Sequence, residues 1–225
     1  MHKTDYLGIH ERAYKRIIDE GRTGWSDNQS VQVMVNVILS GLKKQGLSSG
    51  SILELGCGDG SISLEMESRG YRVFGIDIVP TAIEWANSKV AEQKAHADFQ
   101  VGDVMNLPYP DQNFDVVVDA SCSHCIIGDD RKLFFSEAYR VLKPEGVFIL
   151  NCLCDDPPQN LVPFFDTESR CLVKGDIAGR YYGETDKILK ETEMAGFINL
   201  SWTTEKNEHG DNELVLYSKK QGNVR

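Results

Sequence analysis

The stretch SILELGCGDGS, residues 51–61, decides the fold of this chain. A short apolar run that contains one acid, Glu54, leads directly into glycines at positions 56, 58 and 60. Glycine permits positive φ angles and lets another group approach the backbone closely. The apolar content predicts a buried strand before the loop, and a helix is expected after it. In open α/β sheets ligands bind at this end of the strands, so the loop predicts a binding site.

Outward from this loop, strand patterns and helix patterns alternate along the chain, which predicts a mostly parallel sheet with helices on both faces. The strands are expected at 51–55, 71–77, 97–103, 114–120 and 147–153, and the helices between them at 61–70, 80–93 and 129–146. Two further helices are expected at 10–21 and 28–46, and an antiparallel hairpin at 197–206 and 212–220. The fold class is therefore α/β and Rossmann-like.

The domain organisation follows from the same pass along the chain. A length of 225 residues fits one domain, with an N-terminal helical cap at 1–49 and a ligand-binding core at 50–153. Residues 155–183 contain three prolines and no clear periodicity. Long irregular segments in compact domains are usually functional or disordered, and the aromatic residues here argue against disorder. This segment is interpreted as a lid or substrate-recognition insertion, followed by a helix and hairpin at 184–220.

Charge and cysteine content narrow the function classes. The net charge of −10 disfavours a nucleic-acid partner, because phosphate binding needs a basic footprint. No apolar run has the length of a membrane span, and the N-terminus has no secretory signal. The six cysteines are then expected to be reduced thiols in a cytoplasmic protein.

Two ligand classes compete for the glycine loop. A dinucleotide fingerprint needs a third glycine at position 61, which is Ser61 here, and Glu54 is unsuited to a neighbouring pyrophosphate. Asp77 follows Gly56 by 21 residues, where an acid can accept hydrogen bonds from ribose hydroxyls. Asp103 can accept one from an exocyclic amine such as that of adenine. These acids favour a ligand with a ribose, an adenine and an amino-bearing group over the cofactor of a nicotinamide-dependent oxidoreductase, which stays the competing alternative.

Four ordered blocks carry a family resemblance. ELGCGDG, GIDIVPTAIEWA, VGDVMNLPYPDQNFDVVVD and EAYRVLKPEGVFIL together resemble the class I S-adenosyl-L-methionine-dependent methyltransferases of small-molecule type, the methyltransferase domains 11 and 25. The resemblance covers residues 50–153 and the terminal hairpin. It implies a seven-stranded sheet whose last strand is antiparallel, with S-adenosyl-L-methionine laid across the ends of strands one to three and S-adenosyl-L-homocysteine as product.

The resemblance also implies a role for individual residues. Those assigned to the cofactor are Glu54, Gly56, Cys57, Gly58, Asp77, Ile78, Asp103, Val104, Asp119 and Ser121. Glu54 supports the loop, Asp77 takes the ribose, and Asp103 with Val104 borders the adenine. Asp119 and Ser121 lie under the methyl group. Each residue also has a plainer interpretation, with Cys57 as a small buried residue and the aspartates as helix caps or turn residues.

The acceptor side is less defined. Cys122 and Cys125 follow the fourth strand, and Cys152 and Cys154 alternate on the fifth, so four thiols can converge with His124 on a soft ion or a metalloid substrate. The alternative is that the thiols pack as small hydrophobes, and no regular zinc spacing is present, so no metal site is assigned. His124 is the candidate general base. Trp25 and Tyr181 join Cys122 and Cys125 as candidate substrate residues.

The sequence therefore predicts an enzyme that transfers a methyl group from S-adenosyl-L-methionine to a small molecule, within enzyme class 2.1.1. A methyltransferase directed at thiols or metalloids, and a non-catalytic module that binds the cofactor, remain as alternatives. The sequence does not define the acceptor or the oligomeric state.

Overall fold

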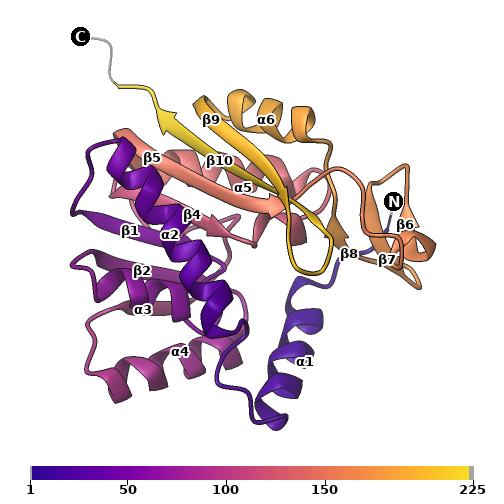
Figure 1. Cartoon of the computed structure of the whole chain (residues 1–225), viewed down its shortest axis with the longest axis horizontal. Helices are drawn as coiled ribbons and strands as arrows, with labels where there is room; N and C mark the ends of the chain where they lie inside the picture. Colours follow the sequence, from indigo (N-terminus) through magenta and orange to yellow (C-terminus); the bar gives the residue numbers. More distant parts are fainter. Residues whose placement is uncertain (1, 223–225) are drawn as a thin grey trace.

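A seven-stranded sheet organises the computed structural model, which describes residues 2–222 (Figure 1). Its order is β3-β2-β1-β4-β5-β10-β9. The bounds are β1 (Ser51–Leu55), β2 (Arg72–Asp77), β3 (Asp98–Val101), β4 (Phe114–Ala120), β5 (Leu142–Leu153), β9 (Phe197–Lys206) and β10 (Asn212–Lys220). Strands β1 to β5 pair in parallel, and β10 is antiparallel to both β5 and β9. The predicted Rossmann-like sheet with its antiparallel last strand is confirmed.

Helices cover both faces of this sheet. They are α1 (Tyr6–Asp19), α2 (Asn28–Lys44), α3 (Ser61–Glu67), α4 (Pro80–Gln93), α5 (Asp130–Val141) and α6 (Thr185–Met194), with short 3-10 turns η1 (Ser123–Cys125) and η2 (Val162–Phe164). Helices α2, α3 and α4 share one buried cluster with the sheet, and α5 and α6 share another on the opposite face. None of the helices within residues 2–222 is long and apolar enough to cross a membrane.

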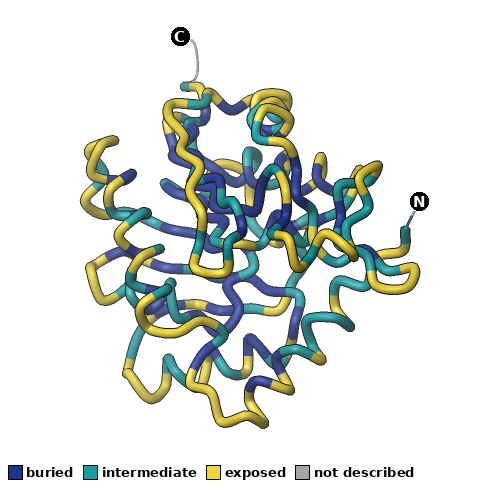
Figure 2. The backbone as a smooth tube through the Cα atoms, turned by 45° about the vertical axis from the view of Figure 1, so that its right-hand side comes forward, coloured by how far each residue is buried: buried dark blue, intermediate teal, exposed yellow. Residues whose placement is uncertain are grey.

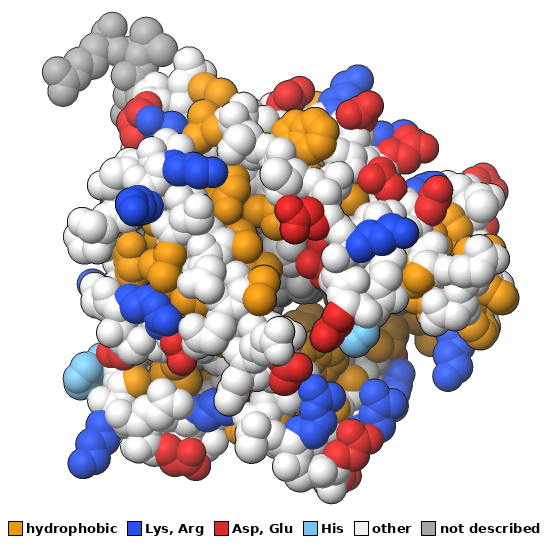
Figure 3. Space-filling model, viewed as in Figure 1, with side chains coloured by type: hydrophobic (Ala, Val, Ile, Leu, Met, Phe, Trp, Pro, Cys, Tyr) orange, Lys and Arg blue, Asp and Glu red, His pale blue; other side chains and the backbone are white. Residues whose placement is uncertain are grey.

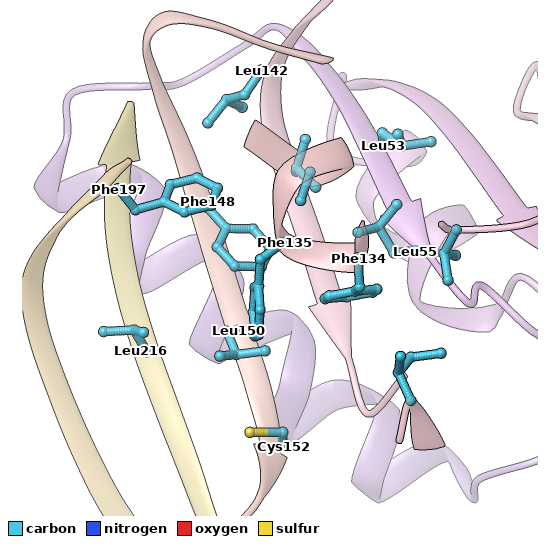
Figure 4. Close-up of a cluster of buried hydrophobic side chains, with 14 of the residues drawn as sticks. Leu53, Leu55, Phe134, Phe135, Leu142, Phe148, Leu150, Cys152, Phe197 and Leu216 are labelled. Atoms are coloured by element: carbon cyan, nitrogen blue, oxygen red, sulfur yellow. The ribbon is translucent and has the colours of Figure 1, made fainter. Parts of the chain in front are cut away.

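The two cores arise from strand alternation. Val117 of β4 points into the α5–α6 core, whereas its neighbours Val116 and Val118 point into the α2–α4 core. The central strands β1, β4 and β5 are mostly buried, whereas the edge strand β9 is mostly exposed (Figure 2). In the α5–α6 core the ring of Phe148 stacks on that of Phe197, with centroids 4.8 Å apart (Figure 4). Buried aromatic contacts of this kind fix how the hairpin sits against the parallel strands.

Two segments differ from the sequence-based prediction. The predicted helix over 129–146 ends earlier, because α5 stops at Val141 and Leu142 is already extended. Pro144 disfavours helical backbone at Lys143, so the chain enters β5 at once. Within 155–183, where no element was predicted, strands β6 (Phe165–Asp166), β7 (Cys171–Lys174) and β8 (Ile177–Tyr181) form a small antiparallel sheet.

Helix α1 begins four residues earlier than predicted. The Asp5 side chain caps it by accepting a hydrogen bond from the backbone N–H of Gly8 at 2.9 Å. Just before it, Lys3 pairs with Ile177 of β8, so the N-terminus is attached to the small sheet. Tyr14 and Ile17 then bury the inner face of α1 against the start of α4. The N-terminal segment therefore connects the small sheet to the half of the fold that contains α4 and the glycine loop.

The loop after β1 depends on left-handed backbone. Gly56, Gly58 and Gly60 have φ angles of 65°, 55° and 73°. A Cβ atom on Gly60 would lie 2.7 Å from Cζ of Phe99 and 3.1 Å from Cβ of Ala86. Position 60 therefore needs glycine, both for its left-handed conformation and for space. Gly60 is the N-cap of helix α3, which begins at the next residue.

We predict that Gly60→Ala destabilises the protein more than Gly46→Ala does. Gly46 has φ of 71° but no atom within 4 Å of an added Cβ, so alanine there costs only the left-handed conformation, about 1–2 kcal/mol. At Gly60 overpacking adds ~1–3 kcal/mol. Urea unfolding of both variants measures the difference. Equal losses at the two positions would contradict the packing argument.

Candidate functional site

A cavity of about 990 Å³ opens at the carboxyl ends of the parallel strands. Its wall includes the glycine loop, helix α1, the turn after β4, part of α2, β8 and the turn between β9 and β10. In the space-filling view a hollow lies between that turn and α1, with acidic and basic side chains at its rim (Figure 3). The volume is at the upper end of the range for small-molecule and cofactor sites.

Most of the predicted site residues meet in this cavity. Its lining includes Trp25, Glu54, Gly56, Cys57, Gly58, Asp77, Ile78, Asp103, Val104, Ser121, Cys122, His124 and Cys125. These residues come from separate strand ends, so the parallel sheet brings them together. Their individual roles stay predictions. Asp119 and Tyr181, which were also predicted, do not line the cavity.

A group of buried acids lies beneath the glycine loop. Glu54, Asp59 and Asp77 are only 4%, 4% and 8% exposed. Asp77 accepts hydrogen bonds from the backbone N–H groups of Gly58 and Val79, both at 2.9 Å. Each oxygen of Asp77 therefore has one backbone donor and still has a lone pair for a ligand.

The electrostatics of this group favour a cationic ligand. Burial raises the pKa of Glu54 to about 8, and the nearby charges of Asp59 and Asp77 add to the increase. The hydroxyl of Ser63 donates to Glu54 and opposes it. Burial also raises the pKa of Asp77. A positive group bound in the cavity would stabilise the ionised form of each acid.

The N-terminal segment covers the glycine loop. The backbone N–H of Trp25 donates to Asp59 at 3.1 Å, and Lys89 forms an ion pair with the same carboxylate at 2.6 Å. The rings of Tyr14 and Trp25 are 4.7 Å apart between centroids. A Cβ atom on Gly58 would lie 2.3 Å from the Tyr14 hydroxyl oxygen, so glycine is required there.

Tyr14 and Asp59 are thus site residues that sequence reasoning did not assign. Tyr14 lies on a helix distant in sequence, and only the tertiary structure places it over the loop. Asp59 stands inside the glycine motif itself, and its position between Gly58 and Gly60 was the available signal.

At the end of β3, Asp103 lies half-buried in the cavity wall. Its Oδ1 accepts the backbone N–H of Met105 at 2.8 Å, which holds the turn after the strand. Val104 and Ile78 provide apolar surface beside it. A half-buried carboxylate between apolar walls suits the edge of a flat heterocycle.

The structure corrects the role expected for Asp119. Its side chain is fully buried and accepts backbone N–H groups of Cys122 at 2.6 Å and Ser123 at 3.0 Å. Burial raises its pKa to about 6. Asp119 therefore holds the turn after β4 and does not face the cavity.

Ser121 occupies the wall position at the end of β4. It is left-handed, with φ of 80°, and its hydroxyl donates to Asn151 at 3.1 Å. Non-glycine residues in this conformation are uncommon and persist where surrounding contacts hold them.

The cysteines do not converge as the metalloid interpretation requires. Cys122 and Cys125 line the cavity, whereas Cys152 and Cys154 are buried in the α5–α6 core, against which Cys122 also packs; Figure 4 shows Cys152 below Leu150 in this core. Burial raises the pKa of the Cys125 thiol to about 11. Between residues 2 and 222, no group of three or more His, Cys, Asp or Glu side chains is arranged to hold a metal ion. The structure therefore does not support the soft-ion interpretation.

Arg131 organises the turn that presents His124. Its guanidinium donates to the carbonyl oxygens of Ser123 at 2.6 Å and Ile126 at 3.3 Å, and to both carboxylate oxygens of Glu191. Its Cζ also lies 4.4 Å from the ring centroid of Tyr181. Tyr181 is therefore a packing partner of Arg131 and not a wall residue.

We predict that Arg131→Lys destabilises the protein by at least about 2 kcal/mol, because an ammonium group cannot replace the planar set of buried hydrogen bonds. Thermal and urea unfolding measure the loss. Lys132→Ala on the same helix removes only an exposed ion pair with Asp129 and serves as the control. A stability of Arg131→Lys equal to that of the control would show that the turn does not depend on this guanidinium.

Comparisons with known proteins agree on one family. Residues 53–150 match a family model described as a methyltransferase domain. The chain is 28% identical over 130 residues to a 2-heptyl-1-hydroxyquinolin-4(1H)-one methyltransferase of Mycobacteroides abscessus, covering 57% of this chain and 55% of that protein. It is 33% identical over 116 residues to a probable chloroplastic tocopherol O-methyltransferase of Oryza sativa, covering 50% and 31%.

Solved structures share the fold over a longer range. The Burkholderia thailandensis 1,6-didemethyltoxoflavin-N1-methyltransferase, solved with 1,6-didemethyltoxoflavin and S-adenosylhomocysteine, superposes with a TM-score of 0.75 at 18% identity and covers 95% of this chain and 88% of that one. A methyltransferase from Methanosarcina mazei gives 0.71 at 22%, covering 80% and 97%. The chain spans about half or less of the length of the curated relatives named above.

Proposed function

We propose that the chain is a class I S-adenosyl-L-methionine-dependent methyltransferase that transfers the methyl group of this cofactor to a small-molecule acceptor, as the methyltransferase-domain match over residues 53–150 and the similar methyltransferases support. The observation that carries the proposal is the joint geometry of the glycine loop and the buried acids at one end of a 990 Å³ cavity. The named relatives support a small acceptor, because their names refer to a hydroxyquinolinone and to tocopherol.

The residues present fit the cofactor. Gly56 and Gly58 line the cavity without side chains, so their backbone is accessible to the amino-acid portion, while Cys122 and Tyr14 occupy the space that Cβ atoms would need. Burial raises the pKa of Glu54, and the ammonium and sulfonium groups of the cofactor would favour its ionised form. Asp77 would hold the ribose and Asp103 the adenine edge, each with free lone pairs.

Bound S-adenosyl-L-methionine supplies an activated methyl group, so the protein contributes mainly proximity and alignment. Tyr14 and Trp25 cover the loop and exclude water from it. Ser121 and the turn held by Asp119 form the floor toward the acceptor. His124, neutral because burial and nearby positive charges hold its pKa well below the usual range, is available at the wall as a hydrogen-bond partner or base.

Core burial of Cys152 and Cys154 disfavours the thiol-directed alternative. This proposal also includes enzyme class 2.1.1 and a cytoplasmic location. It includes the division of the chain into cap, core, lid and hairpin as well. Free thiols at all six cysteines are consistent with a reducing compartment.

Calorimetric titration with S-adenosyl-L-homocysteine, and with NAD in parallel, tests the proposal. We predict binding of the former and none of the latter. Asp77→Asn should weaken that binding at least about tenfold, because a charge-assisted hydrogen bond to the ribose is lost. The control is Asp98→Asn, which changes an exposed acid outside the cavity. Binding of NAD alone would overturn the proposal, and unchanged affinity in Asp77→Asn would remove Asp77 from the ribose site.

Affinity for S-adenosyl-L-homocysteine should rise with pH. The free protein holds a proton on Glu54 below about pH 8, and the bound ammonium group favours its release. Between pH 6 and 8 the Kd should fall by up to about tenfold per unit and then level off. Glu54→Gln should flatten the profile, whereas Glu84→Gln on the exposed face of α4 should not. A profile that is already flat in the unmodified protein would contradict this account of Glu54.

A further inference from the structure

The acceptor end of the cavity contains an arginine without a partner. Arg180 is an exposed residue of β8 that lines the cavity, and it forms no ion pair or side-chain hydrogen bond with any residue from 2 to 222. The neighbouring Arg131 is fully engaged by Glu191 and two carbonyl oxygens. Strand β8 packs against η1, which carries His124. Arg180 and His124 therefore belong to one wall.

His124 is the second unsatisfied group of this wall. The residue is 7% exposed and lines the cavity. Its Nδ1 is enclosed by protein without a hydrogen-bond partner, and Nε2 has no partner among the described residues either. Because protein encloses Nδ1, a ligand in the cavity would meet the imidazole through Nε2, which has no protein partner among the described residues.

His10 of α1 adds an acceptor. Its Nδ1 lies 2.7 Å from the carbonyl oxygen of Tyr6. A carbonyl can only accept, so Nδ1 carries the hydrogen and, in neutral His10, Nε2 presents a lone pair. His10 also lines the cavity. The wall thus combines one permanent cation with two imidazoles, and a neutral imidazole can either donate to an anion or accept from its conjugate acid.

We infer that the methyl acceptor is a small acid, whose negative charge is bound by Arg180 and whose polar group hydrogen-bonds Nε2 of His124. This inference rests on the proposed function and specifies its substrate class. An amine acceptor would bring an ammonium group against Arg180, where like charges repel. A neutral aliphatic alcohol would leave the guanidinium without a partner.

Acidic side chains of the β9–β10 hairpin also line the cavity, so the experiment below includes a cationic probe compound. Asp211 accepts a hydrogen bond from Tyr182, and Glu213 accepts one from Asn207 at 2.8 Å. Glu205 and Glu208 are exposed at the rim. If these carboxylates and not Arg180 select the acceptor, a cationic compound should bind in preference to an anionic one.

The experiment titrates the full chain, saturated with S-adenosyl-L-homocysteine, with 4-hydroxybenzoate, 4-hydroxybenzamide and 4-hydroxybenzylamine. The three probes share a phenol and differ in charge. We expect 4-hydroxybenzoate to bind at least about tenfold more tightly than the other two, as suits a charge-assisted contact. Arg180→Gln should remove this preference. Lys206→Gln, which changes another cavity-lining cation without an ion pair, should preserve it.

Equal binding of the three probes, preference for the amide or amine, no binding of the benzoate, or a preference that survives Arg180→Gln would each overturn the inference. Binding of S-adenosyl-L-homocysteine is measured first and independently. If S-adenosyl-L-homocysteine does not bind, the proposed function is contradicted. If it binds but the three probes show no charge preference, only the inference of a small acid is contradicted. The same series without S-adenosyl-L-homocysteine tests the charge preference in either case.

Discussion

The contact between the Asp77 carboxylate and the backbone of the glycine loop is the constraint on which the site depends. Asp77 ends β2, and its oxygens accept the N–H groups of Gly58 and Val79. This single side chain fixes the loop after β1 relative to the start of α4. The residue that donates to Asp77, Gly58, is left-handed and must be glycine, because a side chain at position 58 would collide with Tyr14. The shape of the cofactor end thus follows from one buried acid and the absence of side chains around it.

A buried acid also fixes the turn after β4. Asp119 holds the turn through two backbone N–H groups, and Arg131 holds it from the other side through two carbonyl oxygens. Arg131 also reaches Glu191 of α6 and the ring of Tyr181 on β8. The turn with His124 is therefore fixed by segments from the core, the C-terminal part and the small sheet.

Sequence reasoning succeeded where local pattern and fold topology determine the structure. The alternation of strands and helices placed Glu54, Asp77 and Asp103 at neighbouring strand ends, and the structure has them lining one cavity. It did not place Tyr14 over Gly58, because that contact joins a helix to a loop more than forty residues away. It expected Asp119 to face the cavity, since strand alternation does not reveal that a carboxylate turns back to cap its own turn.

The segment over 155–183 shows a second limit. Its strands are two to five residues long, too short for a period to be recognised, and they are stabilised by pairing with each other and with Lys3. The cysteine pattern left two interpretations open, and the structure supports packing for Cys152 and Cys154, which share a strand face that turns into the core. In both cases the deciding contacts are tertiary.

The most direct test of the central claim is a crystal structure of the chain with S-adenosyl-L-homocysteine. The account predicts the amino-acid portion against Gly56 and Gly58, the ribose hydroxyls on Asp77 and the adenine beside Asp103. The thioether sulfur should then point toward Ser121 and the wall formed by His124 and Arg180. A ligand bound elsewhere, or bound with its adenine at the glycine loop, would contradict it.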